Sequence, residues 1–163
     1  QLPEDQTDMR ILEVIYEYFS PNPHYFENFA AYIWDLIEGG SEIIEITRRS
    51  RDGGRDAIGR QKIGLSSDPI WVHWALEAKC YAPNNSVGVG GVQRLISRLL
   101  HRQYGVFVTT SYISEQAYKE IREDGHPVAL ITGKDIVEVL KEKCEVNSPE
   151  TALSWLKNNF PET

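Results

Sequence analysis

A single twelve-residue segment restricts the fold of this chain more than any other. In IWVHWALEAKCY, residues 70–81, the side chains divide into two alternating sets, as they do along a β-strand. One set is apolar and contains Val72, Trp74, Leu76, Ala78 and Cys80. The other set includes Glu77 and Lys79. A strand of this length and pattern predicts a sheet, with a hydrophobic core against the apolar side.

Hydrophobic periodicity and turn residues divide the rest of the chain into further elements. Strands are predicted for residues 42–47, 57–65, 70–81, 104–110 and 127–132. Helices are predicted for residues 5–19, 26–37, 87–103, 114–121, 134–143 and 148–160.

The order of these elements predicts the fold class. Beyond residue 100, strands alternate with helices, which favours parallel pairing through right-handed crossovers. The region 41–82 is rich in strands and suits antiparallel hairpins. We therefore expect an α/β fold, with a mixed central sheet flanked by helices on both faces. The 163 residues suit one domain, divided into an N-terminal helical extension (1–22), a core (24–140) and a C-terminal helix (148–160).

The composition excludes several classes of protein. No apolar run approaches the roughly 20 residues that span a bilayer, so no membrane partner is expected. The two cysteines, Cys80 and Cys144, are too few and too far apart for a disulfide framework or a thiolate metal site. A cytoplasmic location is therefore expected. Because the sequence begins at Gln1 rather than methionine, we interpret it as a piece of a longer protein.

The net charge of −7 hides an uneven distribution. Residues 1–45 carry ten acids and one base, residues 46–111 four acids and ten bases, and residues 112–163 ten acids and six bases. The middle third is therefore +6, between flanks of −9 and −4. Such a region can contact phosphates while the whole molecule stays acidic. DNA is a candidate partner, and a solvated surface with chance clustering is the alternative.

Glu77 and Lys79 lie two residues apart on the predicted strand, so both project from one face. Alone, the pair fits an ion pair at a sheet edge. Asp56 adds a third member, because antiparallel pairing of strands 57–65 and 70–81 places it about 5 Å from Glu77. Two such carboxylates repel unless a cation lies between them, and Mg²⁺ prefers carboxylate oxygens. Lys79 would then stabilise charge that develops on an attacked phosphate.

The segment RDGGRDAIGR, residues 51–60, surrounds Asp56 with glycines and arginines. Its glycines permit a tight turn where the backbone passes a ligand. Asp52 lies in this turn and competes for the metal ion; Asp56 is preferred because it enters the strand. The arginines predicted to contact phosphates near this turn are Arg48, Arg49, Arg51, Arg55 and Arg60. On the helix predicted for 87–103, Arg94, Arg98 and Arg102 form either a phosphate-facing stripe or a solvated face.

An aspartate after a DGG turn, followed by a strand with E-A-K, resembles the PD-(D/E)XK nuclease motif. The segments FENFAAYIWDLI, IEITRRSRDGGRDAIG, LEAKCY, VGGVQRL, YGVFVTTSYISEQAYKE and VALITGKDIVEVL follow the order of an Mrr-like restriction endonuclease catalytic domain. The resemblance covers residues 24–140 and implies a restriction-endonuclease-like fold. It also implies Asp56 and Glu77 as metal ligands, Lys79 as the catalytic lysine, and Glu27 and Gln93 as supporting polar residues.

The chain departs from this family pattern at two places. Many Mrr-like domains carry Gln where this chain has Glu77, which is the more general nuclease form. The insertion QKIGLSSDPIWVH separates Asp56 from Glu77 and leaves the pairing register of the two strands open.

We therefore predict an Mg²⁺-dependent DNA endonuclease domain, with Mn²⁺ able to substitute. It is expected to be the cleavage module of a restriction enzyme, including one that acts on modified DNA. No base-reading element is evident, so a specificity domain or subunit outside this chain is expected, together with a homodimer for double-strand cutting. The alternatives are a resolvase or repair nuclease on the same fold, or a catalytically silent domain for DNA binding or dimerisation.

Overall fold

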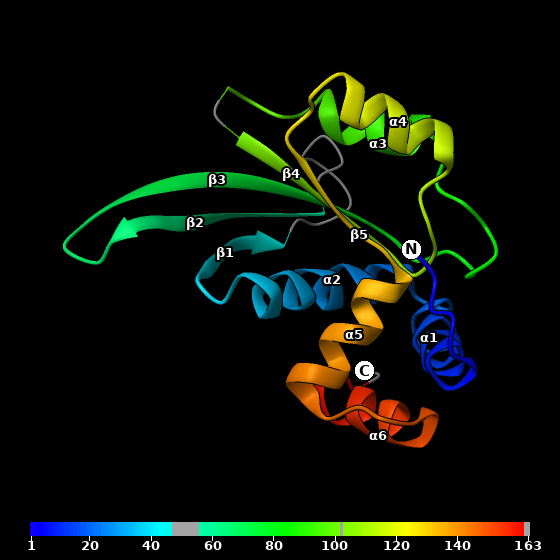
Figure 1. Ribbon diagram of the computed structural model, residues 1–163. Helices are drawn as coiled ribbons and strands as arrows, with labels where there is room; N and C mark the ends of the chain where they lie inside the picture. The colour runs from blue at the N-terminus through cyan, green and yellow to red at the C-terminus, as the bar shows by residue number, and fades with distance from the viewer. Residues whose placement is uncertain (47–55, 102, 162–163) are drawn as a thin grey trace.

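The computed structural model describes residues 1–46, 56–101 and 103–161 (Figure 1). Within these residues the strands form one five-stranded sheet in the order β1-β2-β3-β4-β5. The strands are β1 (Ser41–Ile46), β2 (Ala57–Leu65), β3 (Asp68–Lys79), β4 (Gln103–Thr109) and β5 (Val128–Ile131). The helices are α1 (Gln6–Phe19), α2 (Pro23–Glu38), α3 (Val89–Ile96), α4 (Glu115–Glu123), α5 (Gly133–Cys144) and α6 (Pro149–Asn159).

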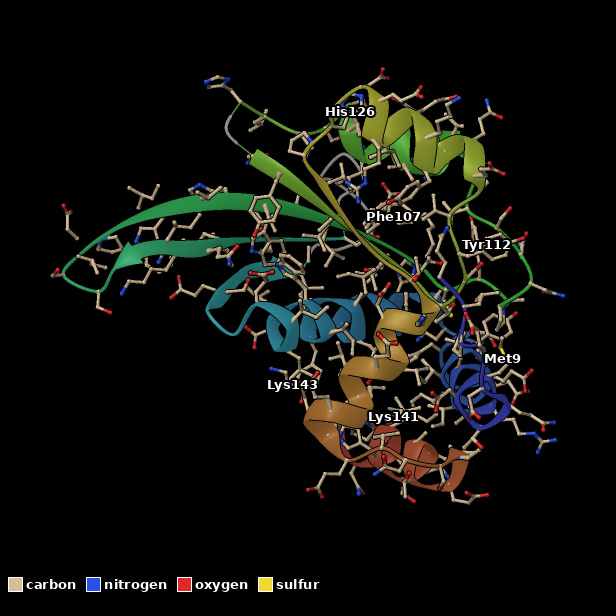
Figure 2. The ribbon with its side chains drawn as sticks, viewed as in Figure 1. Met9, Phe107, Tyr112, His126, Lys141 and Lys143 are labelled. Atoms are coloured by element: carbon tan, nitrogen blue, oxygen red, sulfur yellow. The ribbon has the colours of Figure 1, made fainter. Side chains whose placement is uncertain are left out.

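The sheet is mixed, and helices cover both of its faces (Figure 1). Strands β1, β2 and β3 pair antiparallel, whereas β3, β4 and β5 pair parallel. The larger core lies between the sheet and α1, α2, α5 and α6, and it includes Trp74 and Leu76 of β3. Ala75 and Phe107 face the opposite side, where they pack with residues of α3 and α4 (Figure 2). The predicted α/β architecture is confirmed.

Helix α1 helps to close the larger core. Its residues Ile11 and Phe19 have no exposed surface. Asp5 caps the helix by accepting hydrogen bonds from two backbone N–H groups of its first turn. Lys141 Nζ of α5 lies 2.7 Å from Asp8 Oδ1 of α1, which ties the two helices together (Figure 2). None of the helices in the described parts of the chain is both long and apolar enough to cross a membrane.

Strands β2 and β3 form a long hairpin whose tip projects beyond the helices (Figure 1). Their pairing runs from Ala57 opposite Leu76 to Leu65 opposite Asp68 without a shift in register. The insertion noted in the sequence therefore lengthens both strands equally. Because the extra residues are added at the tip, the pairing at the other end of the hairpin is preserved.

Helix α3 is shorter than the helix predicted for residues 87–103. It ends at Ile96, and Gln103 already belongs to β4. The Gln103 side chain closes the intervening turn by accepting a hydrogen bond from the Leu100 N–H at 3.1 Å. Gln103 also pairs with His73 of β3 in the parallel sheet. The helical spacing of apolar residues continues past Ile96, but pairing with β3 requires extended backbone from Gln103 onwards.

Gly59 is expected to tolerate no side chain. It pairs with Trp74, and a Cβ at this position would lie 2.1 Å from Trp74 Cζ2 and 2.5 Å from the Glu42 carbonyl oxygen. Trp74 cannot easily move, because it is fully buried and its Nε1 donates to Ser41 Oγ at 2.9 Å. We expect Gly59→Ala to lower the free energy of unfolding by about 3 kcal/mol, measured by urea denaturation.

Gly90→Ala is the matched control for this substitution. A Cβ at Gly90 meets no atom within 4 Å, and alanine is favoured over glycine in a helix. This variant should be as stable as the wild-type chain or more stable. Equal stability of the two variants would contradict the close packing of Gly59 against Trp74.

Candidate active site

Asp56 and Glu77 lie on adjacent strands at the end of the β2–β3 hairpin remote from its tip. The Asp56 N–H donates to the Leu76 carbonyl at 2.9 Å, and Asp56 Oδ2 accepts from the Ala78 N–H at 2.7 Å. These bonds hold Asp56 one position beyond the Ala57–Leu76 pair, and Glu77 is the residue that follows Leu76. The antiparallel pairing expected from the sequence is thus observed, and it places Asp56 next to Glu77 across the two strands.

The carboxylate of Glu77 is buried and surrounded by cations. Glu77 is only 1% exposed, and it pairs in register with the fully buried Phe107 of β4. Lys79 Nζ lies 2.9 Å from Glu77 Oε1, while Arg94 Nη1 and Arg98 Nη1 of the α3 region lie 3.8 Å from Oε1 and Oε2. Burial of a carboxylate is costly without such compensation, and these three cations provide it.

Neither Glu77 oxygen accepts a hydrogen bond within the described residues. The Lys79 ammonium is close enough for an ion pair, but the contact does not satisfy hydrogen-bond angles, and Lys79 Nζ instead donates to the Ala78 carbonyl at 3.2 Å. The pair is therefore electrostatic rather than directional. Buried acceptors of this kind are uncommon in proteins and are compatible with a site that binds a ligand or an ion.

The surroundings of Asp56 disfavour the ionised form of its carboxyl group. Burial raises the pKa of Asp56, although the Ala78 N–H and the nearby charges of Lys79, His24 and Arg98 lower it in part. A group with a shifted pKa beside charged partners is a frequent sign of a functional site. A divalent cation would offset the cost of ionising this carboxylate.

Glu27 reaches the same region from α2. Burial raises the pKa of Glu27, and the negative charge of Asp56 raises it further. Glu27 Oε1 lies 2.6 Å from His24 Nδ1 on the same helix. The sequence predicted Glu27 as a supporting residue, and the structure places it within electrostatic range of Asp56. Residues three apart on a helix are neighbours in any case, so the spacing of His24 and Glu27 alone does not identify His24 as part of a site.

The predicted DNA-contacting arginines occupy different environments. Arg94 and Arg98 each place Nη1 3.8 Å from a Glu77 oxygen, and their predicted phosphate contacts stay a prediction. Arg60 lies farther along the hairpin, where it pairs with Glu42 at 2.5 Å and stacks on Trp71 with 4.2 Å between its guanidinium carbon and the ring centre. Arg48, Arg49, Arg51, Arg55, Arg102 and the competing Asp52 lie outside the described residues.

Gln93 lies on α3, one residue before Arg94. The helix that carries it therefore also carries an arginine that approaches Glu77. Gln93 is half-buried, and its predicted supporting role stays a prediction.

The residues present fit a divalent metal ion. Two carboxylates on adjacent strands offer hard oxygen ligands of the type that Mg²⁺ and Mn²⁺ prefer, and both Glu77 oxygens lack hydrogen bonds within the described residues. No group of three or more His, Cys, Asp or Glu side chains is arranged to hold a metal ion in residues 1–46, 56–101 and 103–161. Asp56 and Glu77 would therefore bind such an ion together with water or substrate oxygens.

A mixed sheet with helices on both faces, an aspartate before one strand and a Glu-x-Lys pair on the next place this chain in the restriction-endonuclease-like class. The family model Mrr_cat, described as a restriction endonuclease, matches residues 20–140. The chain belongs to this restriction endonuclease family, and the family predicted from its sequence is confirmed.

Two solved structures resemble this chain closely. The DNA modification-dependent restriction endonuclease AspBHI has a TM-score of 0.88 and 47% sequence identity over 96% of this chain. The MspJI restriction endonuclease, solved in complex with a 27-mer oligonucleotide, has a TM-score of 0.82 and 28% identity over 99% of this chain. The matched region makes up 40% of the AspBHI chain and 37% of the MspJI chain. No curated protein gives a significant match to this chain.

Proposed function

We propose that this chain is the DNA-cleaving module of a modification-dependent restriction endonuclease, and that it hydrolyses phosphodiester bonds with Mg²⁺ in the cytoplasm. The observation that carries the proposal is the Asp56 carboxylate, held by the Ala78 N–H beside the buried and cation-paired Glu77. Membership of the restriction endonuclease family supports the reaction. The oligonucleotide bound by MspJI supports DNA as the substrate.

Asp56 and Glu77 are the proposed Mg²⁺ ligands, with Mn²⁺ as a substitute. When bound, such an ion lowers the pKa of a coordinated water and polarises a phosphoryl oxygen. The protein contributes two fixed carboxylates in a partly buried site, where electrostatic interactions are stronger than in water.

Lys79 is the proposed catalytic lysine. Its ammonium lies on the same face of β3 as Glu77 and retains partial exposure, at 21%. A compact cation in this position can donate to the attacking water and stabilise negative charge on the phosphoryl oxygens. Glu27 and Gln93 are proposed to support the site as polar groups, and Arg94 and Arg98 to contact the phosphates on either side of the cut.

A plasmid-nicking assay with and without Mg²⁺ tests the proposed function. We expect nicked circles to form only with the divalent ion, because the proposed cleavage reaction depends on an ion held by Asp56 and Glu77. Linear product should appear at higher protein concentration, since one active site cuts one strand and two copies are needed for both. A chain that binds DNA but never cuts it, with Mg²⁺ or Mn²⁺, would instead favour a silent binding or dimerisation domain.

We propose that recognition of the modified base belongs to a specificity domain outside this chain. This chain spans less than half of either neighbour, and the remaining part of a comparable protein offers room for such a domain. On its own, the chain is expected to bind duplexes of unrelated sequence equally and weakly.

Its DNA affinity should fall on the order of 100-fold between low and physiological salt, because release of counterions dominates non-specific binding. Titration of labelled duplexes across a salt series measures this decrease. Tight binding to one sequence that survives high salt would show that the chain reads bases itself.

A further inference from the structure

His24 and Glu27 form a local pair at the beginning of α2. Asn22 precedes the helix and Pro23 occupies its first turn, where a proline fits without loss of a hydrogen bond. Residues three apart lie on one face of a helix, and His24 Nδ1 lies 2.6 Å from Glu27 Oε1. The rigid first turn therefore presents the imidazole to the carboxylate at a short hydrogen-bond distance.

The pair is more enclosed than an ordinary surface ion pair. The Glu27 side chain is 15% exposed. The His24 side chain is 38% exposed, yet its Nε2 atom is buried and has no hydrogen-bond partner within the described residues. Nε2 thus turns away from solvent, while Nδ1 faces the Glu27 carboxylate. A histidine that only improved solubility or helix stability would expose its polar edge.

His24 and Glu27 also lie within electrostatic range of the cleavage site. Burial raises the pKa of Glu27 and the charge of Asp56 raises it further; burial also raises the pKa of Asp56, which the charges of Lys79 and His24 lower in part. The same two residues therefore interact with each other and with the carboxylate assigned to the metal. This separates them from exposed helix pairs, whose contribution is small and local.

We propose that His24 is a positioning residue of this site: its Nδ1–H donates to Glu27 Oε1 and holds that carboxylate towards Asp56. The inference rests on the proposed nuclease function, since it assigns His24 a role in the same site. Without the donor, Glu27 would be free to rotate away from the negative charge of Asp56. His24 acts through Glu27 and touches neither the substrate nor the ion.

The first test is a double-mutant cycle on cleavage. His24→Ala should lower kcat on the order of ten-fold, the lower end of the effect of losing an orienting partner, without changing DNA affinity in Ca²⁺. His24→Asn places a donor near the position of Nδ1 and should recover most of the rate. In a Glu27→Ala background, His24→Ala should have no further effect, because two residues that act as a unit are not additive.

His126→Ala is the matched control. His126 Nε2 lies 3.8 Å from Oδ2 of the exposed Asp124, in a pair that follows the end of α4 (Figure 2). This variant should cut like the wild-type chain. Thermal melting of all variants shows whether they fold equally well. A His24→Ala chain that keeps the wild-type kcat, or whose loss adds fully to that of Glu27→Ala, would overturn the inference.

A crystal structure of the His24→Ala chain gives a readout that does not depend on activity. We expect the Glu27 side chain to change rotamer and turn away from Asp56, whereas in His24→Asn it should keep its position. If Glu27 stays in place in the His24→Ala chain, His24 is not its positioning residue. If the wild-type chain fails to cut but Glu27 moves as expected, the proposed nuclease function fails while the structural link between His24 and Glu27 stands.

Discussion

Lys79→Ala is expected to abolish DNA cleavage while the chain stays folded and still binds DNA. The loss in kcat should reach about 100- to 1,000-fold, the usual effect of removing one preorganised donor to a developing negative charge. The fold should survive because Arg94 and Arg98 remain 3.8 Å from the Glu77 carboxylate and continue to compensate its charge. DNA affinity should change little, because one charge among ten bases in the middle third is a small part of the phosphate attraction.

Lys62→Ala is the matched control for Lys79→Ala. It removes the same charge from an exposed position of β2 and leaves the site intact. Initial cleavage rates of a supercoiled plasmid, DNA affinity in Ca²⁺ and circular dichroism should be measured on both variants. Near wild-type cutting by Lys79→Ala would show that Lys79 is structural. Equal losses in the two variants would show that the effect comes from general phosphate attraction.

The sequence predicted the strands around the site well because their signals are local. The alternation in residues 70–81 and the polar turn before it are sufficient to predict a hairpin. The insertion left the pairing register open in the sequence, and the structure shows why the insertion does not displace Asp56 from Glu77. The extra residues extend β2 and β3 together, so Ala57 still faces Leu76 and Asp56 lies beside Glu77.

The surroundings of Glu77 could not be predicted in the same way. Steps of four on a helix put Arg94 and Arg98 on one side, but spacing alone does not identify the element on which that side packs. The helix predicted for residues 87–103 was also too long. Hydrophobic periodicity does not show that the chain from Gln103 onwards pairs with β3 as a parallel strand. His24 likewise becomes noticeable only when tertiary packing brings α2 towards Asp56.

Asp56→Asn is expected to remove both metal binding and cleavage. The substitution keeps the size of the side chain and an oxygen that can accept from the Ala78 N–H, so it changes the charge and little else. Loss of a direct ligand should weaken Mn²⁺ binding by more than the roughly 10- to 100-fold that follows loss of an outer-shell partner. Isothermal titration with Mn²⁺ and the nicking assay measure the two effects.

Two further carboxylates make this test specific. Asp68 is exposed at the tip of the same hairpin, so Asp68→Asn should bind Mn²⁺ and cut like the wild-type chain. Asp52→Asn separates the two candidates in the DGG segment. If Asp52→Asn rather than Asp56→Asn abolishes Mn²⁺ binding, or if an Mn²⁺ soak places the ion on Asp52, the assignment of the metal to Asp56 is wrong.

Asp56→Asn is expected to remove function but not to lower the stability of the metal-free chain. Burial raises the pKa of Asp56 in the folded chain, so the ionised carboxylate destabilises the fold at neutral pH. This destabilisation is absent at low pH, where the carboxyl is protonated in both states, and is complete above the raised pKa. Without metal, Asp56→Asn should therefore melt at the same temperature as the wild-type chain or higher at pH 7, and the difference should vanish on acidification.

Addition of Mn²⁺ should reverse the order of the two chains. An ion that binds only the folded wild-type chain raises its melting temperature by mass action, whereas Asp56→Asn should not respond. A gain in stability together with a loss of function is typical of a residue that is kept for its chemistry. Metal-free Asp56→Asn could instead melt several degrees below the wild-type chain at pH 7. The hydrogen bond from Ala78 would then outweigh the cost of burying the Asp56 carboxylate, and Asp56 would stabilise the fold, contrary to this prediction.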